Sequence, residues 1–131
     1  MSTLDLLKPR PGLRVLVSGA AAAIGAAIAD AFLQAEAKVF VCDVYPSTIK
    51  KAKAGNPAPH TGVADVANRE QVDSIIDNAL AKRGGLDILV NNGGIAGLTG
   101  GVDAIEPDQW ERTISTNLNS HTTFCARLSL C

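Results

Sequence analysis

Cysteine is scarce in this chain of 131 residues, and its three copies are scattered at Cys42, Cys125 and Cys131. An odd number of cysteines at unrelated spacings makes neither a disulfide framework nor a metal site. No apolar run is long enough for a membrane span, and the run within residues 1–12 is too short for a signal peptide. A net charge of −1 argues against nucleic acid and against an anionic membrane as partners. We therefore expect one cytoplasmic globular unit, preceded by a short leader over residues 1–12.

The most informative segment is an apolar strand, a turn of small residues and a helix. Residues 13–18 form the expected strand, and Gly19 and Gly25 bound the turn that follows it. Small and apolar residues then recur over 24–36 at the helical spacing that packs one face against a sheet, at Ile24, Ala27, Ile28, Ala31, Phe32 and Ala35. The N-terminus of such a helix offers free amides and a positive dipole end to an anion such as pyrophosphate. Such turns also serve packing alone, so both interpretations stay open at this point.

A second apolar strand, over residues 38–43, ends in an acidic residue. Asp43 lies 24 residues beyond Gly19, where dinucleotide-binding folds hold a ribose hydroxyl. The structural alternative is that Asp43 caps the helical segment that begins near Pro46. Strand, glycine turn, helix, strand and acid together form one unit typical of a dinucleotide site.

Strands and helices continue to alternate along the rest of the chain. We expect further strands near 60–64 and 86–91, and helices near 46–54, 68–83 and 107–129. Asp65 and Val66 follow the first of these strands, and the run from Asn91 to Gly94 follows the second. This alternation predicts a parallel sheet with right-handed crossovers.

Two of these helices have faces that the sequence assigns to the core. The helix over 68–83 has one apolar face, made of Val72, Ile75, Ile76, Ala79 and Leu80. Asn68 with Gln71 resembles a capping pair at its start. In the last helix, the periodicity predicts a buried stripe through Trp110, Ile114 and Leu118.

These ordered motifs resemble those of the short-chain dehydrogenase/reductase family. That family has a Thr-Gly-x-x-x-Gly-x-Gly turn, an Asp-Val pair after the third strand and Asn-Asn-Ala-Gly after the fourth. Here they stand as Ser18-Gly19 through Gly25, Asp65-Val66 and Asn91 to Gly94, and the helix carrying Asn117 is similar to the one that bears the family's catalytic asparagine. The resemblance runs from about residue 13 to residue 117.

The resemblance implies a fold, a cofactor and a set of roles. The fold is an α/β, Rossmann-like doubly wound parallel sheet, incomplete, with about four strands in the order 3-2-1-4. The cofactor is NAD, and Asn117 takes the catalytic position. The residues implied to bind the cofactor are Gly19, Ala22, Ile24, Gly25, Asp43, Asp65, Val66, Asn91 and Gly93. The domain is expected to span residues 13–131 and to self-associate through its last helix.

Two substitutions and one absence depart from the family pattern. Ala23 stands where the family has its middle glycine, and its Cβ lies where backbone and cofactor come close. Gly93 replaces the usual alanine and mainly adds backbone freedom. The family's catalytic serine and Tyr-x-x-x-Lys pair have no counterpart, since the single tyrosine, Tyr45, is followed four residues later by Ile49. We therefore expect a domain truncated before those residues.

Three classes of function fit this pattern. The first is NAD-dependent hydride transfer to or from a small alcohol or carbonyl substrate, with the chain as given expected to be an inactive truncated form. The second is a dinucleotide-binding or interaction module without catalysis. The third is a fragment of a methyltransferase that uses S-adenosylmethionine, which the run from Asn91 to Gly94 disfavours. A P-loop nucleotidase is excluded because Ala26 and Ala27, not Lys and Ser or Thr, follow Gly25.

Overall fold

The computed structural model describes residues 1–128 and places four parallel strands in one sheet. The strands are β1 (Arg14–Ser18), β2 (Lys38–Asp43), β3 (His60–Val63) and β4 (Ile88–Val90). They are ordered β3-β2-β1-β4, so the predicted strand order is confirmed. Val17 of β1 pairs with Val41 of β2 and with Val90 of β4, so the carboxyl ends of these strands share one edge. The strand order reverses between β1 and β4, which is where such sheets open a ligand crevice.

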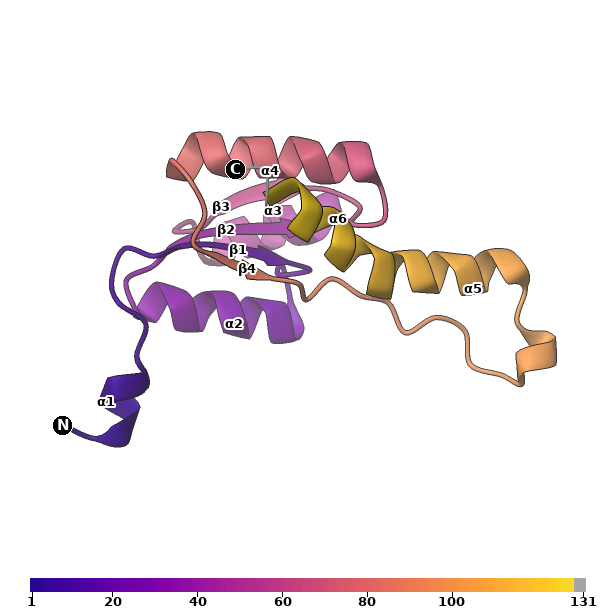
Figure 1. Cartoon of the computed structure of the whole chain (residues 1–131), viewed down its shortest axis with the longest axis horizontal. Helices are drawn as coiled ribbons and strands as arrows, with labels where there is room; N and C mark the ends of the chain where they lie inside the picture. Colours follow the sequence, from indigo (N-terminus) through magenta and orange to yellow (C-terminus); the bar gives the residue numbers. More distant parts are fainter. Residues whose placement is uncertain (129–131) are drawn as a thin grey trace.

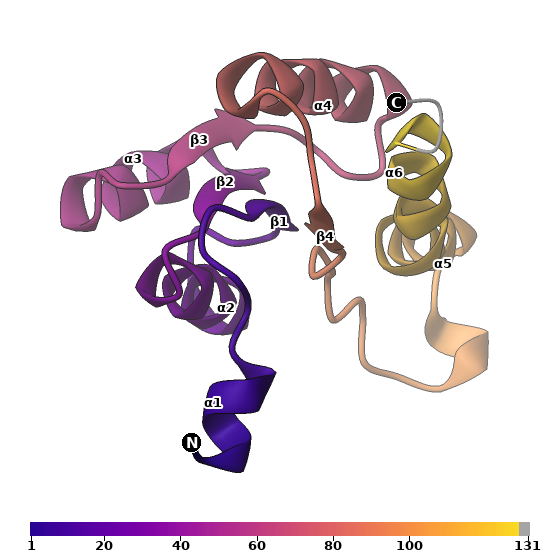
Figure 2. The same ribbon diagram turned by 60° about the vertical axis from the view of Figure 1, so that its left-hand side comes forward.

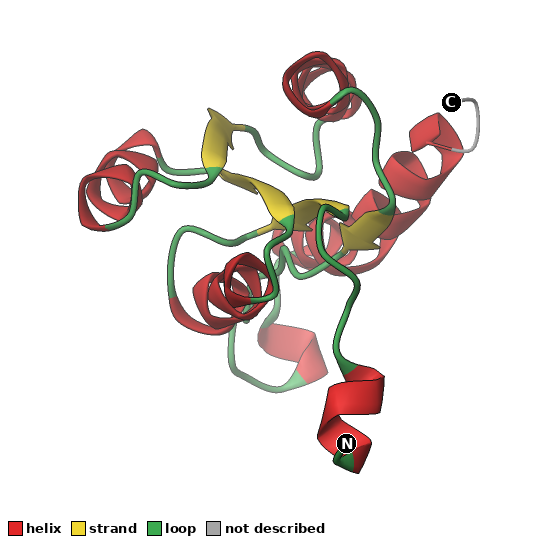
Figure 3. Cartoon of the chain, turned by 90° about the vertical axis from the view of Figure 1, so that its left-hand side faces the viewer, coloured by secondary structure: helices red, strands yellow, loops and turns green. Residues whose placement is uncertain are grey.

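Helices cover both faces of this sheet (Figure 1). The helices of the chain are α1 (Thr3–Leu7), α2 (Ala23–Gln34), α3 (Pro46–Gly55), α4 (Arg69–Arg83), α5 (Pro107–Ile114) and α6 (Ser120–Leu128), of which α1 and α5 lie away from the sheet. Seen end-on, α2 and α3 lie on one side of the sheet and α4 and α6 on the other (Figure 3). The fold is therefore the expected incomplete Rossmann-like α/β sheet. None of the helices in residues 1–128 has the length and apolar character needed to cross a bilayer.

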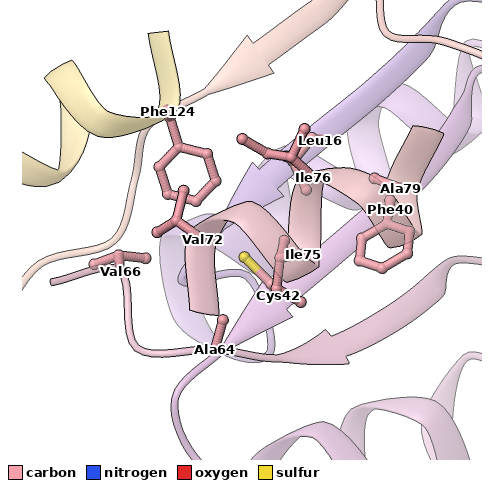
Figure 4. Close-up of a cluster of buried hydrophobic side chains, with 10 residues drawn as sticks. All are labelled: Leu16, Phe40, Cys42, Ala64, Val66, Val72, Ile75, Ile76, Ala79 and Phe124. Atoms are coloured by element: carbon pink, nitrogen blue, oxygen red, sulfur yellow. The ribbon is translucent and has the colours of Figure 1, made fainter. Parts of the chain in front are cut away.

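Two apolar clusters hold these layers to the sheet. The cluster on the α4 and α6 side, shown in Figure 4, includes Phe40 of β2 and Phe124 of α6, both fully buried. Fully burying a side chain of this size contributes about 1.5–3 kcal/mol. Cys42 lies in the same cluster, where burial, with a smaller contribution from the Asp43 charge, raises the pKa of its thiol to about 12. The thiol is thus protonated at neutral pH and fills space in the core.

Helix α4 has the face and the ends that its sequence predicts. Four of its apolar residues are buried, namely Val72, Ile75, Ile76 and Ala79. The Asn68 side chain accepts a hydrogen bond from the Gln71 N–H at the start of the helix, over 3.1 Å. The helix ends at Gly84 in a left-handed conformation, with φ of +74°.

Helix α2 is rotated relative to the prediction. Ile24, expected to be buried, is 72% exposed, whereas Gly25 and Ala29 are the buried residues of this helix. The rotation follows from a close backbone approach: a Cβ on Gly25 would lie 2.3 Å from the Gly19 carbonyl oxygen. Gly25 must face the sheet for that approach, so Ile24 turns outward.

The last helix is interrupted where a continuous helix was expected. A π-helical segment, η2 (Ser115–Asn119), joins α5 to α6, and a 3-10 turn, η1 (Val102–Ala104), precedes α5. The predicted buried stripe is wrong, because Trp110 is 55% and Leu118 is 62% exposed. The wider π turn changes the helical phase, so Thr116, Ser120 and Phe124 face inward instead. Residue 129, where we expected the helix to end, and Cys131 lie outside the described residues.

An ion pair joins the start of β1 to the turn that precedes β4. The Arg14 guanidinium donates to both Asp87 carboxylate oxygens, each over 2.9 Å, and the Arg14 backbone N–H donates to Oδ2 over 2.8 Å. Arg14 Nη1 also donates to the Gly84 carbonyl over 2.8 Å. These bonds from Arg14 hold the pKa of the Asp87 carboxyl well below its usual range.

Asp87→Asn is expected to lower the melting temperature at pH 7, because the amide loses the charge-assisted bonds to Arg14. A carboxylate whose pKa is depressed by folding stabilises the native state above the unfolded pKa, about 3.9 for Asp, and loses that contribution as the pH falls below it. The difference between wild type and Asp87→Asn should therefore shrink below about pH 4. Thermal unfolding followed by circular dichroism at pH 7 and pH 3 measures it. Asp103→Asn, which removes an exposed carboxylate from η1, is the control; an equal and pH-independent loss in both variants would contradict the assignment.

Candidate functional site

A cleft of about 510 Å³ opens at the carboxyl ends of the strands. Segments that follow all four strands line it, together with the start of α2 and residues of α5 and η2. Eight of the nine predicted cofactor residues are in its wall: Gly19, Ala22, Ile24, Gly25, Asp43, Asp65, Val66 and Gly93. The structure thus brings together residues that are spread over most of the sequence.

The glycine turn lets helix α2 begin close to the end of β1. Gly19 has a φ of +62°, and a Cβ there would lie 2.9 Å from the Gly93 Cα. A Cβ on Gly25 would lie 2.6 Å from Asn92 Nδ2. Gly19 is therefore required by its left-handed φ and by a close backbone contact, and Gly25 by its close contacts alone.

The start of α2 faces the cleft without a side-chain cap. Its N-cap residue, Ala22, has no side chain that accepts a hydrogen bond from the first turn. The backbone N–H groups in the first turn of this 12-residue helix, and the positive end of its dipole, are therefore available to an anion. The turn from Gly19 to Gly25 is too tightly packed for a Cβ at either glycine, and it lies next to the uncapped helix start. This arrangement suits a pyrophosphate group.

Ala23 has a backbone conformation that favours glycine. Its φ is +51°, and its exposed side chain lies in the cleft wall. A left-handed L-residue other than glycine is strained by about 1–2 kcal/mol. The chain therefore keeps the backbone geometry of the glycine turn while placing a methyl group in it.

Ser18 and Asn92 join the ends of β1 and of the edge strand β4, and neither was given a role of its own on sequence grounds. The buried Ser18 hydroxyl accepts from the backbone N–H groups of Asn92 and Gly93, over 3.0 and 2.9 Å. The Asn92 amide donates to the Gly19 carbonyl over 3.0 Å. The sequence did contain a signal for these bonds, since Ser18 ends β1 and Asn92 follows the neighbouring strand β4.

Asp43 contacts the glycine turn across the cleft. Its Oδ2 accepts from the Ala21 N–H over 3.2 Å and its Oδ1 accepts from the Val44 N–H over 2.8 Å. The carboxylate is thus held at the edge of the cleft rather than used as the cap of α3, whose N-cap is Tyr45. Both oxygens retain a lone pair that can accept from a ligand hydroxyl.

Asp65 and Val66 form the wall that follows β3. Asp65 Oδ1 accepts from the Ala67 N–H over 2.9 Å, and Oδ2 pairs with Arg112 of α5 at 2.9 Å. Val66 is buried and lies against Gly93, where an added Cβ would approach its methyl groups to 3.2 Å. The family's usual alanine at position 93 would therefore be a tight fit beside Val66.

Asn91 and Asn117 do not line the cleft. Asn91, the ninth predicted cofactor residue, directs its Nδ2 toward the Cys125 sulfur at 3.8 Å, on the α6 side. The Asn117 amide pairs with the backbone of Ile95, accepting from its N–H and donating to its carbonyl, each over 2.8 Å. The Asn117 side chain thus holds the segment after β4 against η2.

Comparison with known proteins assigns the family. A family model described as short chain dehydrogenase matches residues 14–130. The chain belongs to this family. A short-chain dehydrogenase/reductase of Colletotrichum higginsianum, dpchG, is 34% identical over 115 residues, covering 83% of this chain and 42% of its own length. A 3beta-hydroxysteroid dehydrogenase 2 of Eggerthella lenta is 32% identical over 114 residues, covering 83% and 44%.

Solved structures of other short-chain dehydrogenases share the fold. The 3-ketoacyl-(acyl-carrier-protein) reductase of Brucella melitensis, solved as a complex with NADH, superposes with a TM-score of 0.85 at 28% identity, covering 90% of this chain and 49% of that one. A glucose/ribitol dehydrogenase from the same organism gives 0.83 at 26% identity, covering 93% and 54%. The chain spans about half the length of these relatives.

Gly25→Ala is expected to lower the free energy of unfolding by about 3 kcal/mol or to prevent folding, because the new methyl overlaps the Gly19 carbonyl and the Asn92 amide. Gly55→Ala, at the end of α3, is the matched control, since a Cβ there meets no atom within 4 Å. It should change stability by less than about 1 kcal/mol. Urea unfolding of both variants tests this, and similar midpoints would contradict the close packing of α2.

Proposed function

We propose that the cleft binds NAD and that the chain is the cofactor-binding part of an oxidoreductase acting on an alcohol or carbonyl substrate. The observation that carries the proposal is the uncapped start of α2 facing the narrow glycine turn, with Asp43 across from it. An anion at the helix and a hydroxyl donor at the carboxylate together match the pyrophosphate and ribose of a dinucleotide.

The residues divide the cleft into regions for the parts of that cofactor. The pyrophosphate lies at the start of α2, near Ala22 and Ile24. The adenosine ribose hydroxyls donate to Asp43, and the adenine lies by Asp65 and Val66. The nicotinamide lies toward the Gly93 end, next to the segment that Asn117 holds. The similarity to the Brucella reductase, whose structure was solved as a complex with NADH, supports this assignment.

NAD rather than NADP is the cofactor that the charges favour. A 2′-phosphate in place of the ribose hydroxyl would lie against the Asp43 carboxylate, and two negative groups in contact repel strongly. Val44, the next residue, offers no cation to neutralise such a phosphate. Among the described residues of the cleft wall the one cation is Arg112, which already pairs with Asp65.

Hydride transfer would be the chemistry that bound NAD supplies, and it belongs to the proposal for the whole protein. Asn117 contributes there by position: its side chain is bonded to Ile95, so it orders the loop beside the nicotinamide end and is not itself a proton donor.

Self-association through the last helix is supported by the exposure of Trp110 and Leu118. The free thiols of Cys42 and Cys125 suit a cytoplasmic location.

Calorimetric titration is expected to show NAD binding at least about tenfold tighter than NADP, a difference of 1.4 kcal/mol. Asp43→Asn keeps an acceptor oxygen but removes the charge, so the preference should narrow, mainly through a gain in NADP affinity. Asp103→Asn, outside the cleft, should leave both affinities unchanged. Tighter binding of NADP by the wild type would overturn the NAD assignment.

Ala23→Gly should raise the free energy of unfolding by about 1 kcal/mol and also tighten NAD binding, because it removes both the strained conformation and the methyl beside the pyrophosphate. Glu36→Gly is the matched control. Among residues 1–128, Glu36 is the other non-glycine residue with a positive φ, +60°, and it lies beyond the far end of α2. It should gain stability with no change in affinity. If both variants gave the same affinity as wild type, Ala23 would not face the cofactor.

A further inference from the structure

Two oppositely charged side chains meet at the cleft from segments that are distant in sequence. Arg112 Nη2 of α5 lies 2.9 Å from Asp65 Oδ2, in the turn after β3. Both residues belong to the cleft wall. Among residues 1–128 this is the one ion pair that joins α5 to another element or loop.

The Asp65 partner is held firmly by its own turn. Its backbone N–H donates to Gln71 Oε1 over 2.8 Å, and its backbone carbonyl accepts from the Asn68 N–H over 3.0 Å. Its second carboxylate oxygen accepts from the Ala67 N–H over 2.9 Å. The carboxylate therefore has a set position relative to β3 and α4.

The Arg112 partner lies on a helix with few other attachments. Helix α5 extends beyond the sheet in Figure 1, and η2 joins it to α6. In Figure 2, α5 and α6 lie on the opposite side of β4 from α2. No residue from 91 to 114 is buried. The Arg112 carbonyl accepts from the Thr116 hydroxyl over 2.9 Å, and Thr116 is itself a buried residue of the cleft wall. The Arg112 backbone is thus hydrogen-bonded to η2, which carries Asn117.

We propose that Arg112 and Asp65 form a latch that the adenosine half of the cofactor covers and strengthens. This rests on the proposed function and adds a residue to it. The planar guanidinium, oriented by Asp65, lies against the face of the adenine, as arginine does with aromatic rings. An exposed ion pair contributes little in water, but a base that covers it excludes solvent and strengthens it. Cofactor binding therefore holds α5, and with it Thr116 and Asn117, in the position described.

AMP is the probe for this latch because it carries the adenosine half alone. The single tryptophan of the chain, Trp110, lies on α5 and reports on that helix by its emission. We expect AMP to bind the wild type, measured by calorimetry, and to shift the Trp110 emission. Arg112→Gln and Asp65→Asn should each weaken AMP binding about fivefold and abolish the emission shift, with Arg112→Lys between them and wild type.

The double variant separates a latch from two independent contacts. If the residues act as one unit, Arg112→Gln with Asp65→Asn should bind AMP about as weakly as either single variant, whereas independent effects would multiply to about 25-fold. Arg69→Gln, an exposed arginine at the start of α4, is the control and should bind as wild type. Circular dichroism verifies that each variant folds. If Arg112→Gln does not fold, the comparison is made with Arg112→Lys, which keeps the charge.

Each outcome decides between the two proposals. AMP and NAD binding by the wild type with no loss in the Arg112 variants would overturn the latch and leave the proposed function standing. Weaker binding with an unchanged Trp110 emission shift would also overturn it, because α5 would then not follow the cofactor. Failure of the wild type to bind either ligand would overturn the proposed function and the latch together.

Discussion

The approach of helix α2 to the end of β1 is the contact on which the cleft depends. Gly25 lies against the Gly19 carbonyl and the Asn92 amide at distances that no side chain tolerates. The Ser18 hydroxyl and the Asn92 amide hold the segment after β4 to the same point. This contact brings an uncapped helix start and two strand ends together, so the proposed anion site is a consequence of the packing. The rotation of α2, including the outward turn of Ile24, has the same origin.

Asp43 and Asp65 show how structural and binding roles combine in this fold. Each carboxylate accepts backbone hydrogen bonds that hold its own loop, and each still borders the cleft. Because the loops are held from within, a ligand meets groups that are already placed and loses less free energy on ordering them. One carboxylate can therefore hold its own loop and still be available to a ligand in the cleft.

The sequence predicted the elements of this fold better than their orientations. Strand order and the apolar face of α4 followed from alternation and periodicity, because α4 packs on the sheet through one regular stripe. The phase of α2 depends on a long-range backbone contact at Gly25, and that of the last helix on the π turn at 115–119, neither of which periodicity encodes. The cleft residues were largely found from their motifs, whereas Asn92 and Arg112 were missed because their roles depend on partners distant in sequence.

The segment from 91 to 114 gives the chain two levels of stability. It contributes no buried residue, while the sheet and its helices contain both apolar clusters. Regions with little buried surface open locally at a free energy below that of global unfolding. Backbone amides of this segment should therefore exchange with solvent through local opening, and a ligand that contacts it must supply the free energy that orders it. The cleft thus has one wall built into the folded core and another, from the segment 91–114, that contains no buried residue.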